Sequence, residues 1–236
     1  MTNILVLDTA TEACSAALLH DEQVSFQYEL APQAHTRKIL PMCQTLLQDA
    51  GLELTALDAI AFGQGPGSFT GVRIGIGVAQ GLAFGAQRPL IGISNLAALA
   101  QGSWRRQQAR HVVCAIDARM NEVYFGAYVE QDGVMTPLCD EEVLAPEVAQ
   151  QKIKVLLDHA APGTWWACGT GFTAYPQLLD AVPEQLTLDS EHLPDARDML
   201  PLAVAAWQEG KGCAPELATP VYLRDKVTWK KLPGRE

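Results

Sequence analysis

Two aspartates that follow apolar runs are the residues best placed to do chemistry in this sequence. Asp8 follows residues 4–7 and Asp117 follows residues 112–116, and both runs read as buried strands. In a two-lobed nucleotide-binding protein, carboxylates at such positions approach the phosphates and a magnesium ion, with Thr9 beside them. The alternative is that each aspartate only shapes the turn after its strand. The pattern therefore indicates either a phosphate site or two structural turns.

Glycine-rich turns between a strand and a helix are the second candidate. The stretch GQGPGSFTG contains Gly65 and Gly67, which permit a tight turn. Such a turn can hold phosphate on backbone amides, but it matches neither of the standard phosphate-binding glycine motifs. A second turn, from Gly169 to Gly171, could accept adenosine or ribose, whereas the glycine-free loop at 117–121 is not expected to fold closely around a phosphate. Alternatively, glycine only gives these turns their shape.

Other catalytic signatures are missing from the sequence. None of the five histidines forms a His-x-x-x-His pair, and no two of the six cysteines form Cys-x-x-Cys. The sequence also lacks a Gly-x-Ser-x-Gly elbow for a serine nucleophile. We therefore expect no metal centre, no bound cofactor and no catalytic residue of these types.

Charge and hydropathy limit the partners that the chain can have. Its 236 residues are 48% hydrophobic with a formal net charge of −10, so a large core is expected but a broad nucleic-acid-binding face is not. Scattered cysteines indicate a reduced, cytoplasmic protein, and no apolar run approaches the ~20 residues of a membrane span. Lys226, Lys230 and Lys231 belong to a basic C-terminal run that reads as a solvated tail or a contact for RNA.

The order of elements predicts an α/β protein in which one unit occurs twice. Three strands, a helix, a strand, a helix, a strand and a helix make up the first unit, and a looser copy follows. We expect a first lobe at 1–106, a second lobe at 107–194 and a basic tail at 211–236. The helix near 195–210 is free to return to the first lobe. Each lobe should be a mixed sheet flanked by helices, with a ligand cleft between them.

The helix after the first glycine-rich turn carries three further glycines. Gly77, Gly81 and Gly85 recur every four residues and so form a smooth strip on one face. Each glycine inside a helix costs roughly 1 kcal/mol relative to alanine. Several of them therefore indicate close packing, either within this chain or against a partner.

Five segments resemble the bacterial TsaB (YeaZ) family, namely VLDTAT, HTRKILP, GQGPGSFTGVRIGI, IDARMNEVY and PVYLR. The resemblance extends over the whole chain. It implies the two-lobed fold of actin, sugar kinases and Hsp70, which is a duplicated ribonuclease H-like fold. It also implies a role in forming N6-threonylcarbamoyladenosine next to the tRNA anticodon, by transfer of threonylcarbamoyl from threonylcarbamoyl-AMP.

In that family TsaD is the catalyst, a TsaE ATPase joins it, and TsaB is a non-catalytic scaffold and activator. The metal-binding His-x-x-x-His pair of TsaD corresponds here to Asn95 and Leu99, and leucine cannot ligate a metal. The resemblance thus implies a TsaD-like paralogue and a TsaE-like ATPase as partners, a homodimer when the chain is alone, and tRNA contact only through the complex. The competing interpretation is an ATP-dependent kinase or ATPase that uses Asp8 and Asp117.

The family's partner surface is formed by two helices, here at residues 35–50 and 71–85. The implied interface residues are Ile39, Cys43, Leu46, Leu47, Ile74, Gly77, Val78, Gly81 and Gly85. The glycine strip agrees with that assignment, since small residues let a partner helix approach closely.

Overall fold

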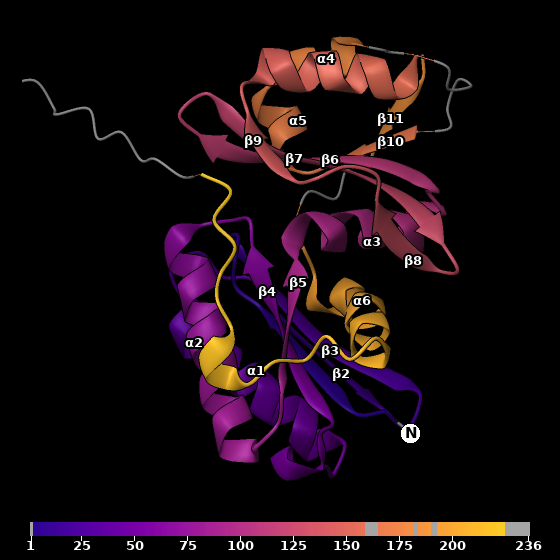
Figure 1. The fold of residues 1–236 in the computed structure, drawn as a ribbon. Helices are drawn as coiled ribbons and strands as arrows, with labels where there is room; N and C mark the ends of the chain where they lie inside the picture. The colour runs from indigo at the N-terminus through magenta and orange to yellow at the C-terminus, as the bar shows by residue number, and fades with distance from the viewer. Residues whose placement is uncertain (1, 159–164, 182–183, 190–192, 225–236) are drawn as a thin grey trace, which may run out of the picture.

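The computed structural model describes residues 2–158, 165–181, 184–189 and 193–224. These residues form two lobes, each built on one β-sheet (Figure 1). The first sheet has the strand order β3-β2-β1-β4-β5. The strands are β1 Ile4–Asp8, β2 Ala13–His20, β3 Gln23–Leu30, β4 Ala59–Gly65 and β5 Leu90–Ser94. β1, β4 and β5 pair in parallel, whereas β2 pairs antiparallel with both β1 and β3.

The second sheet repeats this arrangement. Its order is β11-β10-β6-β7-β8, and β9 pairs with residues 123–125 at the start of β7. The strands are β6 His111–Arg119, β7 Glu122–Gln131, β8 Val134–Pro137, β9 Glu142–Leu144, β10 Trp165–Cys168 and β11 Leu186–Leu188. β6 takes the place of β1: it pairs antiparallel with β7, which pairs antiparallel with β8, and on its other side it pairs in parallel with β10, which pairs in parallel with β11. The predicted fold is therefore confirmed: two mixed sheets flanked by helices, in a duplicated ribonuclease H-like, actin-like architecture.

Helices cover the faces of both sheets (Figure 1). α1 and α2 pack on one face of the first sheet, and α6 packs on its other face against β1 and β2. α3 lies between the lobes, while α4 and α5 cover the outer face of the second sheet. The helices are α1 His35–Asp49, α2 Phe69–Ala86, α3 Asn95–Gln107, α4 Pro146–Leu157, α5 Thr170–Ala174 and α6 Ala196–Gln208, with 3-10 turns η1 Leu54–Ala56, η2 Pro176–Ala181 and η3 Pro215–Leu217.

Side-chain caps begin two of these helices, as their sequences suggest. The Ser94 hydroxyl accepts hydrogen bonds from the amides of Leu96 at 3.1 Å and Ala97 at 3.2 Å, which starts α3. The Asp195 carboxylate accepts from the amide of Arg197 at 2.8 Å, which starts α6. α5 begins directly after Gly169 and is followed by the 3-10 turn η2.

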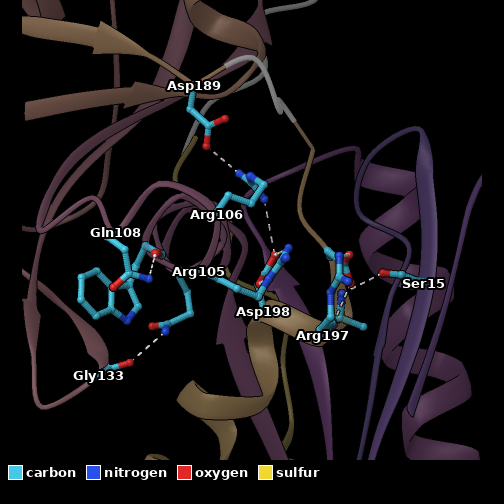
Figure 2. A network of polar contacts seen from close by, with 12 residues as sticks. Ser15, Arg105, Arg106, Gln108, Gly133, Asp189, Arg197 and Asp198 are labelled. Carbon is cyan, nitrogen blue, oxygen red and sulfur yellow. Dashed lines mark hydrogen bonds and ion pairs between the residues drawn. The ribbon is translucent and has the colours of Figure 1, made fainter. Parts of the chain in front are cut away.

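A charged network joins the two lobes between α3, α6 and the end of β11 (Figure 2). Arg105 donates twice to Asp198, at 2.5 and 3.1 Å. Arg106 lies between the lobes, 2.7 Å from Asp189 and 3.7 Å from Asp198. Both carboxylates are buried, so the guanidinium groups supply the charge that these sites need.

Residues 211–224 form a strap alongside α2 (Figure 1) and do not extend into solvent as expected for the start of a tail. Gln80 donates to the carbonyls of Pro215 at 3.0 Å and Ala218 at 3.2 Å. At the end of the strap, Arg224 forms an ion pair with Glu122 of the second lobe. The tail lysines at 226, 230 and 231 lie outside the described residues. Among the helices that are described, none is both long enough and apolar enough to cross a bilayer.

Candidate functional site

β1 ends at Asp8, whose side chain is completely buried. Its Oδ1 accepts hydrogen bonds from Nδ2 of Asn95 at 2.8 Å and from the amide of Ala10 at 3.3 Å. Asn95 in turn accepts from the amide of Gly65 at 2.9 Å. Gly63 lies so close to the carboxylate that a Cβ there would overlap Oδ1. The ends of β1 and β4, together with α3, therefore enclose Asp8.

Burial raises the pKa of Asp8 from 3.8 to about 6, although hydrogen bonds from Asn95 and from the amides of Ala10 and Thr9 partly oppose the shift. The Oδ2 atom has no hydrogen-bond partner among the described residues. Removal of water disfavours the ionised form, which explains the direction of the shift. In this conformation the Asp8 carboxylate is shielded from any ligand in solution.

Thr9 and the first turns of α2 are packed together. Thr9 is buried, and its hydroxyl donates to the carbonyl of Gly71 at 2.7 Å. A Cβ at Gly75 would lie 2.8 Å from the same hydroxyl, and one at Gly71 would overlap the Thr9 carbonyl. Gly71 and Gly75 are therefore the glycines that this helix needs for close packing. The sequence analysis missed them, although their four-residue spacing in GVRIG is the same signal that it used for the later glycines.

The glycine-rich turn is occupied by contacts within the chain. The amide of Ser68 donates to the carbonyl of Ala10 at 2.7 Å, and the amide of Gly65 is bonded to Asn95. A Cβ at Gly67 would lie 2.5 Å from the Ala10 carbonyl, and one at Gly65 would lie 2.8 Å from the carbonyl of Val221 in the strap. This geometry supports the structural interpretation of the turn, because two of its amides already have acceptors.

The second lobe gathers the other predicted residues around Asp117, which is half-buried. The Asp117 amide donates to the hydroxyl of Thr170 at 3.1 Å, and the carboxylate forms a 3.0 Å ion pair with Arg119. Gly169, with φ +113°, and Gly171 both lie against Ala115 of β6, where a Cβ at either would collide. The structure thus brings Asp117, Gly169 and Gly171 together, and it places Asp8, Thr9, Gly65 and Gly67 in a separate cluster in the first lobe.

The loop after Asp117 is tighter than the sequence suggested. β6 continues to Arg119 and β7 starts at Glu122, so the turn has only two residues. Met120 and Asn121 have φ values of +57° and +60°, as in a type I′ hairpin. The loop thus makes a tight turn without glycine, and the expectation that it does not fold around a phosphate stays a prediction. Pairing of the flanking strands holds both residues in the left-handed region.

Asn95 and Leu99 have structural roles in this chain. Asn95 is fully buried and links Asp8 to β4, as described above. Leu99 is 1% exposed and packs in a core cluster between α3 and the second sheet with Cys114 and Cys168. Across the described residues, no group of three or more His, Cys, Asp or Glu side chains could hold a metal ion.

Four of the residues assigned to a partner surface face the core instead. Ile39, Cys43, Leu46 and Leu47 of α1 all pack between that helix and the first sheet. Their part of the predicted interface is therefore revised, because a partner cannot reach these side chains while α1 is docked. The error arose because the apolar side of an amphipathic helix is the side that its own domain buries.

The remaining predicted interface residues lie on the outer side of α2. Gly77, Gly81 and Gly85 are exposed, and no atom lies within 4 Å of a Cβ built on any of them. Ile74 and Val78 are half-buried beside them, and Phe84 is 76% exposed. We call this surface the α2 face; it consists of Ile74, Gly77, Val78, Gly81, Phe84 and Gly85. It is apolar and smooth, which is the chemistry of a helix-docking surface.

Comparison with known proteins agrees with the resemblance of the five segments. A family model described as TsaD, tRNA N6-adenosine threonylcarbamoyltransferase, matches residues 17–232. The tRNA threonylcarbamoyladenosine biosynthesis protein TsaB of Escherichia coli (strain K12) is 50% identical over 99% of both chains. The TsaB protein of Haemophilus influenzae is 46% identical over 99% of this chain and 98% of that protein.

Solved structures agree as well. YeaZ from Pseudomonas aeruginosa superposes with a TM-score of 0.82 at 47% sequence identity, over 94% of this chain and all of that one. A crystal structure of a protein with similarity to peptidase YEAZ from Pseudomonas aeruginosa gives a TM-score of 0.84 at 48% identity, over 95% of this chain and all of that one. With its fold, its full-length relatives and its five matching segments in agreement, the chain belongs to the TsaB family of tRNA threonylcarbamoyladenosine biosynthesis proteins.

Proposed function

We propose that this chain is the non-catalytic subunit that binds and activates a TsaD-like threonylcarbamoyltransferase, and that it does so through the α2 face. The observation that carries the proposal is the outward position of Gly77, Gly81 and Gly85. Each glycine costs the isolated helix roughly 1 kcal/mol, and none of the three gains a packing contact within this chain in return. The gain is therefore expected in a complex.

The proposed complex acts in the cytoplasm on the adenosine next to the tRNA anticodon. The TsaD-like paralogue transfers the threonylcarbamoyl group from threonylcarbamoyl-AMP, and a TsaE-like ATPase joins the pair. This chain meets tRNA only through the complex, and it self-pairs when alone. Its own strand ends support the non-catalytic role, because Asp8 is enclosed and positions 95 and 99 hold a structural amide and a core leucine.

The first experiment separates the scaffold from an enzyme. Purified chain, tRNA and threonylcarbamoyl-AMP are mixed with and without the TsaD-like partner, and modified adenosine is quantified. We expect product only with the partner. Product formed by this chain alone, at a rate comparable to the complete mixture, would contradict the proposal.

The second experiment tests the α2 face directly. Gly81→Leu should leave the monomer folded, because no atom lies within 4 Å of the added Cβ and leucine favours the helix. It should weaken partner binding about tenfold or more, since overpacking an interface costs typically ~1–3 kcal/mol. Binding is measured by titration of the TsaD-like partner, and folding by a thermal melt.

Ala174→Leu is the matched control. Ala174 is also exposed on a helix, but it lies in α5 of the second lobe. We expect this variant to bind the partner as the unmodified chain does. Equal binding by Gly81→Leu and Ala174→Leu would place the interface elsewhere, and unfolding of Gly81→Leu would mean that the strip packs inside this chain.

A further inference from the structure

A cavity of about 390 Å³ opens beside α4 on the outer side of the second lobe. We call it the α4 pocket; its lining residues are Phe125, Cys139, Val148, Gln151, Lys152, Val155 and Leu156. Val148 and Val155 are 43% and 78% exposed, and their spacing of seven residues places them on the same side of the helix. Another side of α4 packs on the sheet through Ile153 and Leu157. The helix therefore has a second apolar side, which the described residues leave uncovered.

The lining of the α4 pocket favours an apolar side chain over a small polar ligand. Lys152 is the charged residue of the lining, and it already forms an ion pair with Glu142 of β9. Gln151 is the other polar side chain there. Small-molecule sites combine an apolar cavity with several converging polar groups, and here those groups are few. A cavity of about 150 Å³ is enough to hold benzene, so the α4 pocket has room for an indole ring.

The strap brings the chain to the second lobe, close to this pocket (Figure 1). The amide of Val221 donates to the carbonyl of Gln64 at 2.8 Å, which holds the strap on the first lobe. Three residues later, Nε of Arg224 donates to the Glu122 carboxylate at 3.0 Å. Glu122 is the first residue of β7. These contacts fix the point on the second lobe from which residues 225–236 continue.

We propose that residues 225–236 fold back onto the second lobe and that the indole of Trp229 occupies the α4 pocket. These twelve residues, which we call the C-terminal segment, lie outside the described residues, and Trp229 is their largest apolar side chain. A buried tryptophan removes about 150–250 Å² of surface from water. The end of the chain then ties the two lobes together, because the strap is bound to the first and Trp229 to the second. This inference goes beyond the function proposed above and does not rest on it.

The length of chain suits this occupant. Trp229 follows Arg224 by five residues, and five extended residues span about 17 Å. Phe125 of the pocket lining comes three residues after Glu122 on β7, which is about 10 Å along the strand. An odd spacing puts Glu122 and Phe125 on opposite faces of the sheet, so the C-terminal segment has to pass around β9, which flanks β7 there. The remaining reach is available for that turn.

Charge favours the same route. The C-terminal segment contains four basic and two acidic side chains, in a chain whose net charge is −10. Asp140 and Glu147 are exposed, and each is the sequence neighbour of a residue in the pocket lining. Lys230 and Lys231 directly follow Trp229, so an indole in the α4 pocket brings them toward these carboxylates. Complementary charge of this kind steers a contact and fixes its orientation.

Cys139 permits a direct test, because it is a free cysteine in the lining of the α4 pocket. Lys230→Cys puts a second thiol next to Trp229. The matched control combines Lys230→Cys with Trp229→Ser, so its segment is tethered equally but lacks the indole. Under mild oxidation we expect the disulfide to Cys139 to form at least about tenfold faster when Trp229 is present, because a bound indole raises the local concentration of the two thiols. Peptide mapping by mass spectrometry identifies which native cysteine has reacted.

Equal rates in the two chains would overturn the proposal, as would a disulfide that forms with Cys213 in preference to Cys139. A disulfide that links two copies would mean that a segment from another molecule fills the α4 pocket, and it would also overturn the proposal. Neither chain needs a TsaD-like partner for this test. Failure here would therefore leave the function proposed above intact, and failure of partner binding would leave this inference intact.

Trypsin gives a second measurement without cysteine chemistry, because it cleaves after each lysine of the C-terminal segment. Val155→Asp places a carboxylate in the pocket lining, at a side chain exposed enough for the fold to tolerate it. Lys154→Asp is the matched control, since it adds the same carboxylate to α4 outside the lining. We expect Val155→Asp and Trp229→Ser each to speed cleavage of the segment at least about fivefold, because cleavage follows the undocked population. Lys154→Asp should cleave as the unmodified chain does.

The four chains are compared together with their thermal melts. Equal cleavage of all four would overturn the proposal, and so would faster cleavage of Lys154→Asp to the same extent as Val155→Asp. If Val155→Asp melts early, the comparison of Trp229→Ser with the unmodified chain decides, because that substitution alters no residue of the described fold.

Discussion

The two lobes repeat one strand order, but the ends of their first strands differ. In the first lobe Asp8 is buried under Asn95 and Gly63, and its pKa is raised. In the second lobe Asp117 is half-buried, and its strand continues into a tight hairpin. The enclosure of Asp8 depends on a residue from α3, beyond the five strands of its own sheet. A duplicated topology thus repeats the strand ends where a site can form, while the elements that pack beside each strand end determine whether its carboxylate is buried or open.

The largest expected effect tests how tightly the first strand end is closed. Gly63→Ala should lower the free energy of unfolding by about 3 kcal/mol, because its Cβ would overlap the buried Asp8 carboxylate. Gly77→Ala is the control, since it adds a Cβ in open space and should raise stability by up to ~1 kcal/mol. Urea denaturation measures both. A Gly63→Ala variant within 1 kcal/mol of the unmodified chain would show that this strand end can open.

The second prediction uses the pKa of Asp8. Because the folded-state pKa is raised to about 6 from 3.8, the folded chain binds this proton more tightly than the unfolded chain does. The associated stability is present below about pH 4 and is lost as pH rises through 6, by about 2–3 kcal/mol. Asp8→Asn cannot lose a proton there. The difference in unfolding free energy between the two chains should therefore change by that amount across this range.

Asp117→Asn is the matched substitution at the more open strand end. We expect it to change the unfolding free energy at neutral pH by less than about 1 kcal/mol, because Arg119, its ion-pair partner, is largely exposed. If the Asp8→Asn difference curve is flat between pH 4 and 6, the carboxylate is hydrated and the contrast between the lobes is smaller than described.

The third prediction concerns the connection between the lobes. Arg106→Gln removes a guanidinium from between two buried carboxylates, Asp189 and Asp198. Breaking a buried pair costs about 3–5 kcal/mol, but Arg105 still neutralises Asp198, so we expect about 2 kcal/mol. Arg110→Gln, at a side chain that is 71% exposed, should cost less than about 1 kcal/mol. Thermal melts rank the two, and equal costs would contradict the role of the network.

The smallest effect is expected at the hairpin of the second lobe. Met120 is exposed and has φ +57°, a conformation that costs most residues energy but not glycine. Met120→Gly should therefore keep or raise the stability, by up to ~1 kcal/mol, although glycine also gains unfolded-state entropy. No equivalent residue is strained after β1, where residues 9–12 have no positive φ. A loss of more than 1 kcal/mol would mean that the Met120 side chain makes contacts of its own.

Local signals in the sequence predicted much of this structure. The apolar runs before Asp8 and Asp117 located β1 and β6, although β6 continues past Asp117 to Arg119. β9 and β11 were missed because each has three residues, too few to show a pattern of alternation. They form only because a neighbouring strand is already in place.

The candidate site was less predictable, because its contacts join distant parts of the chain. Asn95 bonds to a carboxylate 87 residues away, and no pattern in the sequence links the two. Periodicity also identified the strip on α2 but not which of its two glycine faces points outward. Gly71 and Gly75 pack inward at the same four-residue spacing as the exposed Gly77 and Gly81. Periodicity gives the angle between two faces of a helix. Which face is buried depends on the elements that pack beside the helix, and periodicity does not reveal them.

The position of α6 has a consequence for the order in which the protein is made. This helix follows the second lobe in sequence, yet it covers one face of the first sheet against β1 and β2. Synthesis proceeds from the N-terminus, so that face remains bare until nearly the whole polypeptide has left the ribosome. In nascent chains that are halted when residues up to Asp189 have left the ribosome, the amides of β6 and β7 should be protected from hydrogen exchange while those of β1 and β2 still exchange. The lobe that the ribosome begins first is therefore the lobe that it completes last.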